Sequence, residues 1–434
     1  MKIVMVGTGY VGLVSGLCFA EFGYEIVCID NNQSRLKNIS EGKSPFYEPG
    51  LDDLLDKHIN STKRLTLSSD LAKEVKKANV IFITVGTPSR RLEDEADLSS
   101  IIDVAREIAV NISNYSVIVT KSTVPVGTTR KIKEIILEQI SQDQFDVVAN
   151  PEFLREGSAI NDFMRPDRVV IGTDSKKSEK IMKEIYRPLY LLDTPIVSTS
   201  IETAEIIKYA SNSFLATKIS FINEIADLCE VAGANVKDVA KAMGLDKRIG
   251  SKFLHTGPGF GGSCFPKDVK AFSATAKKLG IDLSILNAVN LFNRARPVKI
   301  SSKILKYYDD DLKNVTLTIL GLSFKPNTDD IRDSTSLIIA QELLKKGIKI
   351  KVYDPKAMLN AKKEIRELEF CDNAYEACEQ SSGLIIATEW NEFRALDLNK
   401  IKSLLVKPVI FDLRNIYNPS EISKLGMEYF GIGE

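Results

Sequence analysis

One cysteine, Cys264, lies in a glycine-rich segment, GPGFGGSCFPKD, at residues 257–268. Lys267 and Asp268 follow it, so a cation and a carboxylate stand close to the thiol in the chain. A cysteine reacts as the thiolate, which a nearby positive charge favours, and glycines let the backbone approach a ligand. A cysteine without such neighbours is usually a small buried side chain. The segment alone fits both a nucleophile and a core residue, and the rest of the chain has to decide between them.

The first 30 residues have the pattern of a dinucleotide-binding unit. An apolar strand at Lys2–Val6 leads into GTGYVG at Gly7–Gly12, and an apolar helical pattern follows. A second strand, Glu25–Ile29, ends at Asp30. In this context the glycines allow a tight turn, the approach of a pyrophosphate, and close packing of the helix against the strand. The phosphates would lie at the N-terminus of the helix, where N–H groups attract anions.

Asp30 indicates which dinucleotide is bound. An acid at this distance from the glycines accepts hydrogen bonds from the adenosine ribose, and its charge would repel the 2′-phosphate of NADP. Arg35 is close enough in sequence to attract that phosphate instead. The pattern as a whole predicts NAD as the cofactor.

Three more apolar strands are expected in the first part of the chain, each followed by a loop of small or polar residues. They lie at 79–85, before GTP at 86–88; at 115–120, before KSTVPVGTT at 121–129; and at 146–149, before NPEFLREG at 150–157. Doubly wound parallel sheets bind ligands at the carboxyl ends of their strands. Thr87, Thr123, Glu152 and Glu156 are therefore expected to face one crevice, although each alone could equally be a turn or cap residue.

The middle of the chain has helical periodicity. Apolar residues recur at helical spacing from Ser198 to Cys229 and predict one long helix, on which Lys208 and Asn212 share a face. Further helical patterns cover 231–247, 268–279 and 283–296. We interpret this block as a helical connector that is long enough to form a dimer interface.

A second α/β pattern follows. A strand at 315–321 leads into SFKPNTDDIRDS, a helix at 334–346 and a strand at 349–353, and further strands are expected at 383–388 and 408–412. GxGxxG is missing after the first of these strands, so this part should bind something other than a full dinucleotide. Lys325 and Arg332 lie in its first loop, where they could meet an anionic ligand.

These patterns predict an α/β protein with two Rossmann-like, doubly wound domains joined by a long central helix and a helical middle domain. The expected domains are residues 1–197, 198–300 and 301–434.

Composition excludes several classes of function. The 434 residues include 58 Lys and Arg and 58 Asp and Glu, which leaves no overall basic field for nucleic acid. No apolar run approaches the roughly 20 residues of a membrane span, and the first strand starts too early for a signal peptide. The six cysteines have irregular spacings and there are only two histidines, which argues against a metal site and for a reducing cytoplasm. We expect a cytoplasmic protein without nucleic-acid or membrane partners.

A nicotinamide cofactor and a reactive thiol together permit more than alcohol oxidation. A thiolate at Cys264 can attack an aldehyde to give a thiohemiacetal, whose further oxidation gives a thioester that water hydrolyses. Lys208 and Asn212 could stabilise the oxyanion, and Asp268 and Glu156 could transfer protons. The residues thus allow a four-electron oxidation of CH₂OH to a carboxylate.

The chain resembles the UDP-glucose/GDP-mannose dehydrogenase family over nearly its whole length. Seven stretches carry the resemblance in order: GTGYVG, VGTP at 85–88, KSTVPVGTT, NPEFLREG, KYASNSFLATKISFINE at 208–224, GPGFGGSCFPKD and GLSFKPNTDDIRDS at 321–334. The resemblance implies NAD-dependent oxidation of UDP-glucose to UDP-glucuronate with two NAD per turnover. GDP-mannose is the alternative substrate. An inactive dinucleotide-binding regulator is the alternative outside the enzymes, and the presence of Cys264, Lys208 and Asp268 argues against it.

The resemblance also implies roles for individual residues. Cys264 would be the nucleophile, and Lys208 with Asn212 would stabilise the oxyanion. Asp268 would support Lys208 and a catalytic water, and Thr123 would hold water or take part in proton transfer. Glu156 would assist thioester hydrolysis near the nicotinamide, and Glu152 would be a further catalytic residue of the same substrate-facing segment. The implied cofactor contacts are Gly7, Thr8, Gly9, Tyr10, Val11, Gly12, Asp30, Arg35, Thr87, Thr123, Glu156 and Arg332. The implied substrate contacts are Glu152, Phe153, Leu154, Arg155, Lys208, Asn212, Arg248, Phe253, Leu254, His255, Thr256, Gly257, Gly261, Lys267 and Lys325. In some relatives the residue matching Arg248 reaches the other subunit, which implies a homodimer.

Overall fold

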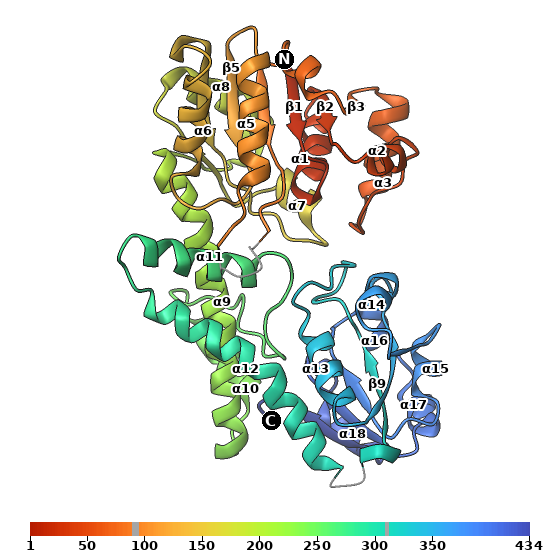
Figure 1. Ribbon diagram of the computed structural model, residues 1–434. Coiled ribbons are helices and arrows are strands. Elements are labelled where there is room, and N and C mark those ends of the chain that lie inside the picture. The colour runs from red at the N-terminus through yellow and green to blue at the C-terminus, as the bar shows by residue number, and fades with distance from the viewer. Residues whose placement is uncertain (89–94, 309–311) are drawn as a thin grey trace. The chain divides into compact units, whose positions relative to one another are not determined.

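The computed structural model describes residues 1–88, 95–308 and 312–434 of the chain (Figure 1). Two compact units make it up. The first comprises Met1–Ser211 and Lys270–Ile281, and the second comprises Asn212–Val269 and Asp282–Glu434. Within the described ranges, no helix is both long enough and apolar enough to cross a membrane.

The first unit is built on an eight-stranded sheet. Its strands are β1 (Lys2–Val6), β2 (Glu25–Ile29), β3 (Leu65–Ser68), β4 (Val80–Ile83), β5 (Ser116–Thr120), β6 (Phe145–Ala149), β7 (Val169–Gly172) and β8 (Ile196–Thr199). They are ordered β3-β2-β1-β4-β5-β6-β7-β8. All neighbours are parallel except β6 and β7, which meet in antiparallel orientation. The first six strands have the 3-2-1-4-5-6 order of dinucleotide-binding folds.

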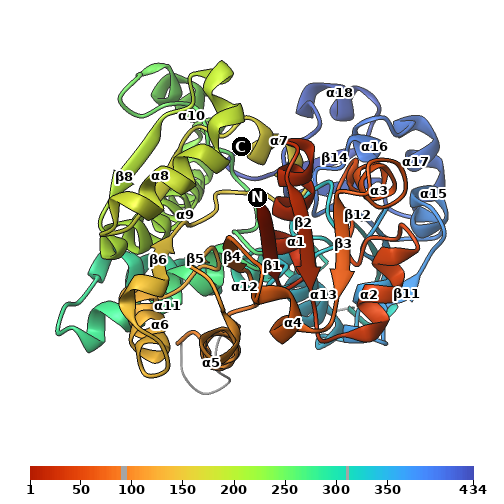
Figure 2. The same cartoon turned by 90° about the horizontal axis from the view of Figure 1, so that it is seen from above.

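Both faces of this sheet are buried under helices. In β1, Ile3 and Met5 belong to the core on one face, and Val4 and Val6 to the core on the other. Such two-sided burial explains why the central strands β1, β4 and β5 are nearly continuous apolar runs in the sequence. Figure 2 shows α5 and α6 on one face and α1 and α7 on the other. The helices are α1 (Tyr10–Glu21), α2 (Gln33–Ser40), α3 (Leu51–Asp56), η1 (Lys57–Ser61), α4 (Leu71–Val75), α5 (Ser99–Asn111), α6 (Thr128–Leu137), η2 (Gln142–Gln144), α7 (Ala159–Met164), α8 (Lys176–Ile185) and η3 (Arg187–Leu192).

The long helix α9 (Ile201–Ala232) carries the chain from the first unit into the second. It is followed by α10 (Val236–Leu245), α11 (Phe265–Lys278) and α12 (Ser284–Tyr307). After α12 and the short η4 (Leu312–Asn314), the second unit builds a six-stranded sheet in which all neighbouring strands are parallel, ordered β11-β10-β9-β12-β13-β14. Its elements are β9 (Thr316–Leu320), α13 (Thr335–Leu344), β10 (Lys349–Tyr353), α14 (Met358–Glu364), β11 (Glu369–Phe370), α15 (Ala374–Cys378), β12 (Leu384–Ile386), α16 (Asn391–Arg394), α17 (Leu398–Leu404), β13 (Val409–Asp412), α18 (Pro419–Lys424) and β14 (Glu428–Gly431).

The second sheet repeats the 3-2-1-4-5-6 order of the first. Two Rossmann-like sheets and a helical region between them in sequence confirm the predicted fold class. The strands predicted at 2–6, 25–29 and 349–353 have the observed bounds.

The predicted start of the long helix is wrong. Residues 196–199 form the edge strand β8, which pairs in parallel with β7, and the helix begins only at Ile201. Ser198, Thr199 and Ser200 separate the apolar residues of the strand from those of the helix, and these polar residues do not by themselves mark where the helix begins.

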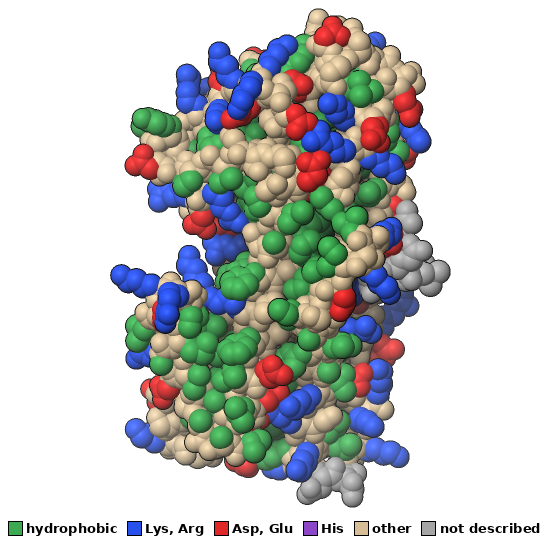
Figure 3. All heavy atoms as spheres, turned by 90° about the vertical axis from the view of Figure 1, so that its left-hand side faces the viewer, with side chains coloured by type: hydrophobic (Ala, Val, Ile, Leu, Met, Phe, Trp, Pro, Cys, Tyr) green, Lys and Arg blue, Asp and Glu red, His purple; other side chains and the backbone are tan. Residues whose placement is uncertain are grey.

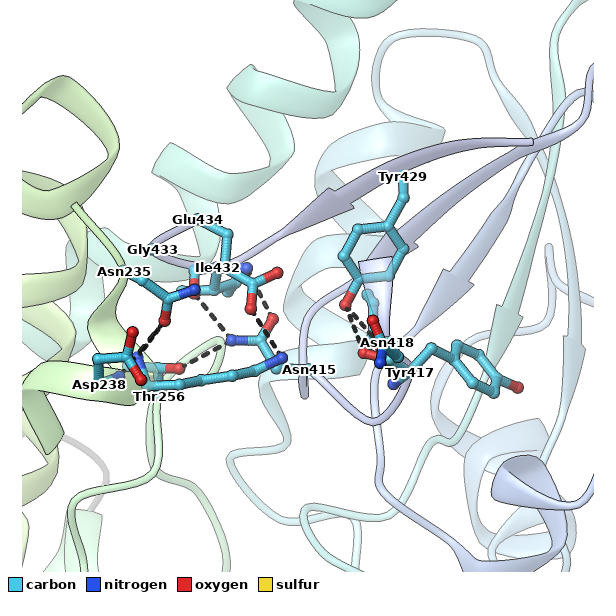
Figure 4. Close-up of polar contacts among 12 residues, drawn as sticks. Asn235, Asp238, Thr256, Asn415, Tyr417, Asn418, Tyr429, Ile432, Gly433 and Glu434 are labelled. Atoms are coloured by element: carbon cyan, nitrogen blue, oxygen red, sulfur yellow. Dashed lines mark hydrogen bonds and ion pairs between the residues drawn. The ribbon is translucent and has the colours of Figure 1, made fainter. Parts of the chain in front are cut away.

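The next helix begins later than the 231–247 pattern predicts. Gly233 adopts a left-handed φ of 69°, which follows the last turn of α9. Asn235 then caps α10, because its side-chain oxygen accepts the N–H groups of Lys237 and Asp238 (Figure 4). The pattern predicted at 283–296 continues as α12 to Tyr307.

Candidate active site

The predicted site residues are distributed over both units. The first unit contains Gly7, Thr8, Gly9, Tyr10, Val11, Gly12, Asp30, Arg35, Thr87, Thr123, Glu152, Phe153, Leu154, Arg155, Glu156 and Lys208. The second contains Asn212, Arg248, Phe253, Leu254, His255, Thr256, Gly257, Gly261, Cys264, Lys267, Asp268, Lys325 and Arg332.

The glycine turn of the first unit has the shape that a dinucleotide needs. Gly7 has a left-handed φ of 108°, and a Cβ on Gly12 would lie 1.9 Å from the Gly7 carbonyl oxygen. A Cβ on Gly9 would meet no atom within 4 Å, so the space above it is open. Gly9 is the N-cap of α1 and has no side chain to occupy the helix terminus. The turn therefore offers helix N–H groups to an approaching pyrophosphate.

Asp30 lies directly after β2 and is buried. Its carboxylate accepts the Thr8 N–H at 3.0 Å and the Thr8 hydroxyl at 2.6 Å, and Arg35 donates to it at 3.0 Å. Burial raises the pKa of this carboxyl, but the hydrogen bonds, led by that from the Thr8 hydroxyl, outweigh burial and hold the pKa below its ordinary value. Because Arg35 is paired with Asp30, its charge is partly neutralised.

The loops after β4 and β5 are joined by hydrogen bonds. The Thr87 hydroxyl donates to the Thr123 carbonyl at 2.9 Å, and the Ser122 hydroxyl donates to the Val85 carbonyl at 2.7 Å. Thr87 and Thr123 are thus brought together, as the sheet topology predicts.

Glu152 and Lys208 form a buried ion pair. The Lys208 ammonium lies 2.9 Å from the Glu152 carboxylate, and both side chains are more than nine-tenths buried. Glu152 also accepts the N–H of Leu154, and Lys208 lies 5.4 Å from the centre of the Phe153 ring. Arg155, by contrast, turns to Asp162, to which it donates at 2.9 and 2.6 Å.

A second buried lysine, Lys121, interacts electrostatically with this pair. Lys121 is buried at the end of β5 and donates to Asn150 and Tyr186, both at 3.2 Å. Burial lowers its pKa to about 8; the Glu152 carboxylate acts in the opposite direction, and the Lys208 charge adds to the lowering. Three ionisable groups are therefore electrostatically coupled inside the first unit.

The segment that carries Glu156 is tied to the glycine turn by Glu48. The Glu48 carboxylate accepts the N–H groups of Gly157 at 2.6 Å and Ala159 at 2.8 Å, and the Tyr10 hydroxyl also donates to it. Burial, followed by the hydrogen bond to Glu48, raises the pKa of Tyr10, which therefore keeps its proton. Glu156 itself is buried.

In the second unit, Cys264 is the residue directly before α11. Its carbonyl oxygen accepts the N–H of Asp268 at 2.8 Å, the bond that opens the helix. The Ser263 hydroxyl lies 3.5 Å from the Cys264 sulfur. Cys264 is half-buried, whereas the other five cysteines are buried. A helix N-terminus favours the thiolate, so this geometry distinguishes Cys264 from a core cysteine.

Asp268 is almost completely buried, and its carboxylate accepts hydrogen bonds from one polar and one charged side chain. The Asn212 amide donates to it at 2.7 Å and the Lys267 ammonium lies at 2.7 Å. Asn212 follows Lys208 by one turn of α9. In the structure, Asp268 is bonded to Asn212 and Lys267, while Lys208 is bonded to Glu152.

The glycines of the cysteine segment pack tightly against residues 324–333. A Cβ on Gly261 would lie 2.3 Å from the Asp333 carbonyl oxygen, and one on Gly262 would lie 2.6 Å from the Phe324 ring. The Gly262 N–H donates to the Arg332 carbonyl at 2.8 Å. This contact brings the segment of Cys264 to the loop that holds Lys325 and Arg332.

The residues before Gly257 differ in their surroundings. Arg248 is exposed and pairs with Asp246 at 2.6 Å, and His255 is exposed. Phe253 has a left-handed φ of 65°, and Leu254 is buried. Thr256 accepts a hydrogen bond from Asn415, as Figure 4 shows.

Three family models match consecutive parts of the chain. The NAD binding domain of the UDP-glucose/GDP-mannose dehydrogenase family matches residues 1–190, the central domain matches 202–295, and the UDP binding domain matches 318–419. The chain belongs to the UDP-glucose/GDP-mannose dehydrogenase family. This confirms the resemblance seen in the sequence, and with it NAD as the cofactor of this dehydrogenase.

Similar proteins cover the chain completely. The UDP-glucose 6-dehydrogenase of Rhizobium meliloti (strain 1021) is 49% identical over 435 residues, which span 100% of this chain and 99% of the relative. UDP-glucose 6-dehydrogenase TuaD of Bacillus subtilis (strain 168) is 45% identical, with 100% and 93% covered. A solved UDP-glucose dehydrogenase from Pyrobaculum islandicum aligns with a TM-score of 0.91 at 35% identity and covers 100% of this chain and 97% of that one.

Two buried polar residues of the first unit are not among the residues predicted from the sequence. Lys121 opens the KSTVPVGTT stretch, but no pattern shows that its ammonium is buried. Glu48 stands between prolines in PFYEPG, and an acid in so rigid a loop could have suggested a structural anchor. The partners of both residues lie far away in sequence, so only the fold brings them together.

Proposed function

We propose that the chain catalyses the NAD-dependent oxidation of UDP-glucose to UDP-glucuronate, with two NAD reduced per turnover. The observation that carries this proposal is the position of Cys264 at the N-terminus of α11, because a thiolate there can hold the aldehyde covalently for a second oxidation, a group that an ordinary alcohol dehydrogenase does not use. Full-length relatives named UDP-glucose 6-dehydrogenase support the choice of substrate.

The first unit would hold NAD at the glycine turn and at Asp30. The open space above Gly9 and the uncapped start of α1 fit the pyrophosphate, and Asp30 fits the ribose hydroxyls. Arg35 is held by Asp30 and is therefore less available to a 2′-phosphate. When bound, NAD accepts a hydride from the sugar carbon in each oxidation step.

The chain's own residues would perform the remaining steps. After the alcohol has become an aldehyde, the Cys264 thiolate adds to its carbon and forms the C–S bond of a thiohemiacetal. Lys208 and Asn212 would stabilise the oxygen anion. Loss of a second hydride leaves a thioester, and water then breaks the C–S bond, which releases the carboxylate and restores the thiol.

Proton transfer falls to the carboxylates. Glu152 and Glu156 are both buried in one segment and are the candidates that activate water. Asp268 holds the Asn212 amide and the Lys267 ammonium, so we assign it the task of orienting Asn212. Thr123 would help to hold the water.

The test is the ratio of NADH formed to UDP-glucose consumed by the purified chain. A ratio of two supports the proposal, and a ratio of one indicates an ordinary alcohol dehydrogenase. Faster turnover of GDP-mannose would change the substrate assignment. If no nucleotide sugar gives NADH, the chain is a dinucleotide-binding regulator instead.

We also propose a homodimer through the helical part of the second unit. Phe214, Phe221 and Leu228 recur every seven residues on α9 and are 65%, 46% and 62% exposed. Figure 3 shows hydrophobic side chains gathered on the face of the molecule that includes the helical part of the second unit. Exposed apolar patches of this kind usually mark interfaces. Leu228→Lys should halve the mass measured by sedimentation equilibrium, and an unchanged mass would place the interface elsewhere.

A further inference from the structure

The backbone that leads to Cys264 is held by side chains of two helices. On α12, the Asn293 amide accepts the Phe260 N–H at 2.9 Å and donates to the Phe260 carbonyl at 2.9 Å. One turn later, Arg296 donates to the Gly257 carbonyl at 2.7 Å. On α9, Asn223 accepts the Gly257 N–H at 2.9 Å. Both backbone polar groups of Gly257 and both of Phe260 are thus bound by side chains.

This contact is buried and leaves little room for movement. Arg296 is 3% exposed, and it also donates to the Asn223 carbonyl at 3.1 Å and pairs with Asp227 at 3.3 Å. Gly259, between the two bound residues, has a left-handed φ of 121°. A Cβ on Gly259 would lie 2.8 Å from the Asn293 side-chain oxygen. The segment therefore fits closely against Asn293.

Further bonds hold the same stretch at both of its ends. Asn415 donates to the Thr256 hydroxyl at 3.2 Å, and its amide also forms two 2.8 Å bonds with the backbone of Ile432 (Figure 4). At the other end, the Gly262 N–H donates to the Arg332 carbonyl. Only two residues separate Gly262 from the first residue of α11, so a displacement of this stretch must move the sulfur of Cys264.

We propose that Asn293 and Arg296 are positioning residues that hold the Cys264 sulfur at the N-terminus of α11. They act through the backbone of 257–260 and touch no reacting group. A displacement of about 1 Å at a reacting atom can lower a rate about 100-fold, and a thiol that moves off a helix terminus loses part of the stabilisation of its thiolate. The consequence for turnover rests on the proposed function, whereas the consequence for thiol reactivity does not.

The test uses Asn293→Ala in the full chain, with Asn287→Ala as the matched control. Asn287 lies on the same helix, is exposed, and donates to Asp282. The rate of alkylation by iodoacetamide is measured against pH, and peptide mass spectrometry locates the label at Cys264. We expect Asn293→Ala to move the midpoint of this profile to higher pH and to lower kcat about 100-fold, with KM for NAD within about twofold. Asn287→Ala should match the wild type.

A second pair of variants separates positioning from folding. Arg296→Lys keeps the charge but offers a single donor group in place of the planar fork, and Arg294→Lys is its exposed control on α12. If Asn293→Ala does not fold, Asn293→Gln replaces it, because Gln keeps the amide oxygen and NH₂ group but places them on a longer side chain. The midpoint of the alkylation profile should again move to higher pH. In folded Arg296→Lys the alkylation midpoint should rise while the thermal transition stays within a few degrees of that of Arg294→Lys.

Three results decide the matter. A shifted alkylation profile supports the positioning role even if the wild type gives no NADH, in which case only the proposed function fails. An unchanged profile together with unchanged kcat overturns the positioning role. A fall in kcat with an unchanged profile also overturns it, because Asn293 would then act somewhere other than at the sulfur.

Discussion

Lys121 offers a test of the electrostatics inside the first unit. Its ammonium is buried between Asn150 and Tyr186, and burial lowers its pKa from 10.5 to about 8. Below about pH 8 the lysine is charged in both the folded and the unfolded chain, and burial of the charge destabilises the fold. Between about pH 8 and 10.5 the folded chain has released a proton that the unfolded chain still holds. The free energy of unfolding must therefore rise with pH through this range.

The size of the effect follows from the two pKa values. The difference between 10.5 and about 8 corresponds to about 3 kcal/mol. In a unit of this size, 1 kcal/mol moves the melting temperature by roughly 2–4 °C. Lys121→Met removes the titrating group and keeps most of the length of the side chain. The melting temperature of the wild type, relative to this variant, should therefore rise by roughly 6–12 °C between about pH 7 and pH 10.5.

The measurement is differential scanning calorimetry of both proteins at closely spaced pH values. Lys131→Met serves as the control, because Lys131 is an exposed lysine on α6 of the same unit; its curve should run parallel to that of the wild type. If the Lys121→Met curve is also parallel to that of the wild type, the charge of Lys121 does not change on folding, and burial does not lower its pKa in the folded chain.

Four further substitutions test the candidate site. Glu152→Gln and Glu156→Gln should each be assayed for a sugar adduct on Cys264 by mass spectrometry. The variant that lacks the water-activating base should accumulate the thioester, with kcat lowered about 100-fold. If neither variant carries an adduct, neither glutamate is the base that activates water. Glu152→Gln should also destabilise the chain by about 3 kcal/mol, since it strands a buried charge; unfolding in urea measures this. Gly12→Ala would place a Cβ 1.9 Å from the Gly7 carbonyl oxygen and should abolish NAD binding in calorimetric titration, so retained affinity would contradict the tight turn. Asp30→Ala should bring the affinities for NAD and NADP closer by about tenfold or more, and an unchanged ratio in fluorescence titration would refute its role.

The sequence was most informative where a strand is followed directly by a glycine or an aspartate. The strands at 2–6 and 25–29 are mostly apolar, and the strand at 349–353 alternates lysine with apolar residues. They are followed directly by Gly7, Asp30 and Asp354, and their bounds could be predicted because composition changes abruptly there. The edge strand β8 could not be recognised. It is half exposed and adjoins a helix, so its pattern has neither a clean period of two nor a continuous apolar run.

The types of residue in the candidate site could be predicted from the sequence, but the residues with which they form hydrogen bonds and ion pairs could not. Cys264, Lys208 and Glu152 stand out through motifs, yet the pairing of Lys208 with Glu152 joins residues 56 positions apart. The bonds of Asn293 and Arg296 to the cysteine segment span 33 and 39 positions. In the sequence, Asn293 and Arg296 look like ordinary polar residues of a helix. Their hydrogen bonds to the backbone of 257–260 form only because α12 packs against that segment.

The two sheets show why equal topology does not give equal function. Both place an acid directly after their second strand, Asp30 in one and Asp354 in the other. Asp354 is 1% exposed, and one of its oxygens accepts the N–H groups of Leu322 and Ser323 and the Trp390 indole at 2.7, 3.0 and 3.2 Å. Its other oxygen accepts two backbone N–H groups, both at 2.8 Å.

A carboxylate that already accepts so many hydrogen bonds on both oxygens has no capacity left for a ribose. The turn after β9 differs as well: a Cβ on Gly321 would lie 2.4 Å from the Thr388 Cβ, and no second or third glycine follows to admit a pyrophosphate. The second sheet therefore keeps the strand order of a dinucleotide fold, but the acid after its second strand is bound by Trp390 and by backbone N–H groups. This agrees with the match of this region to a UDP binding domain rather than to an NAD binding domain.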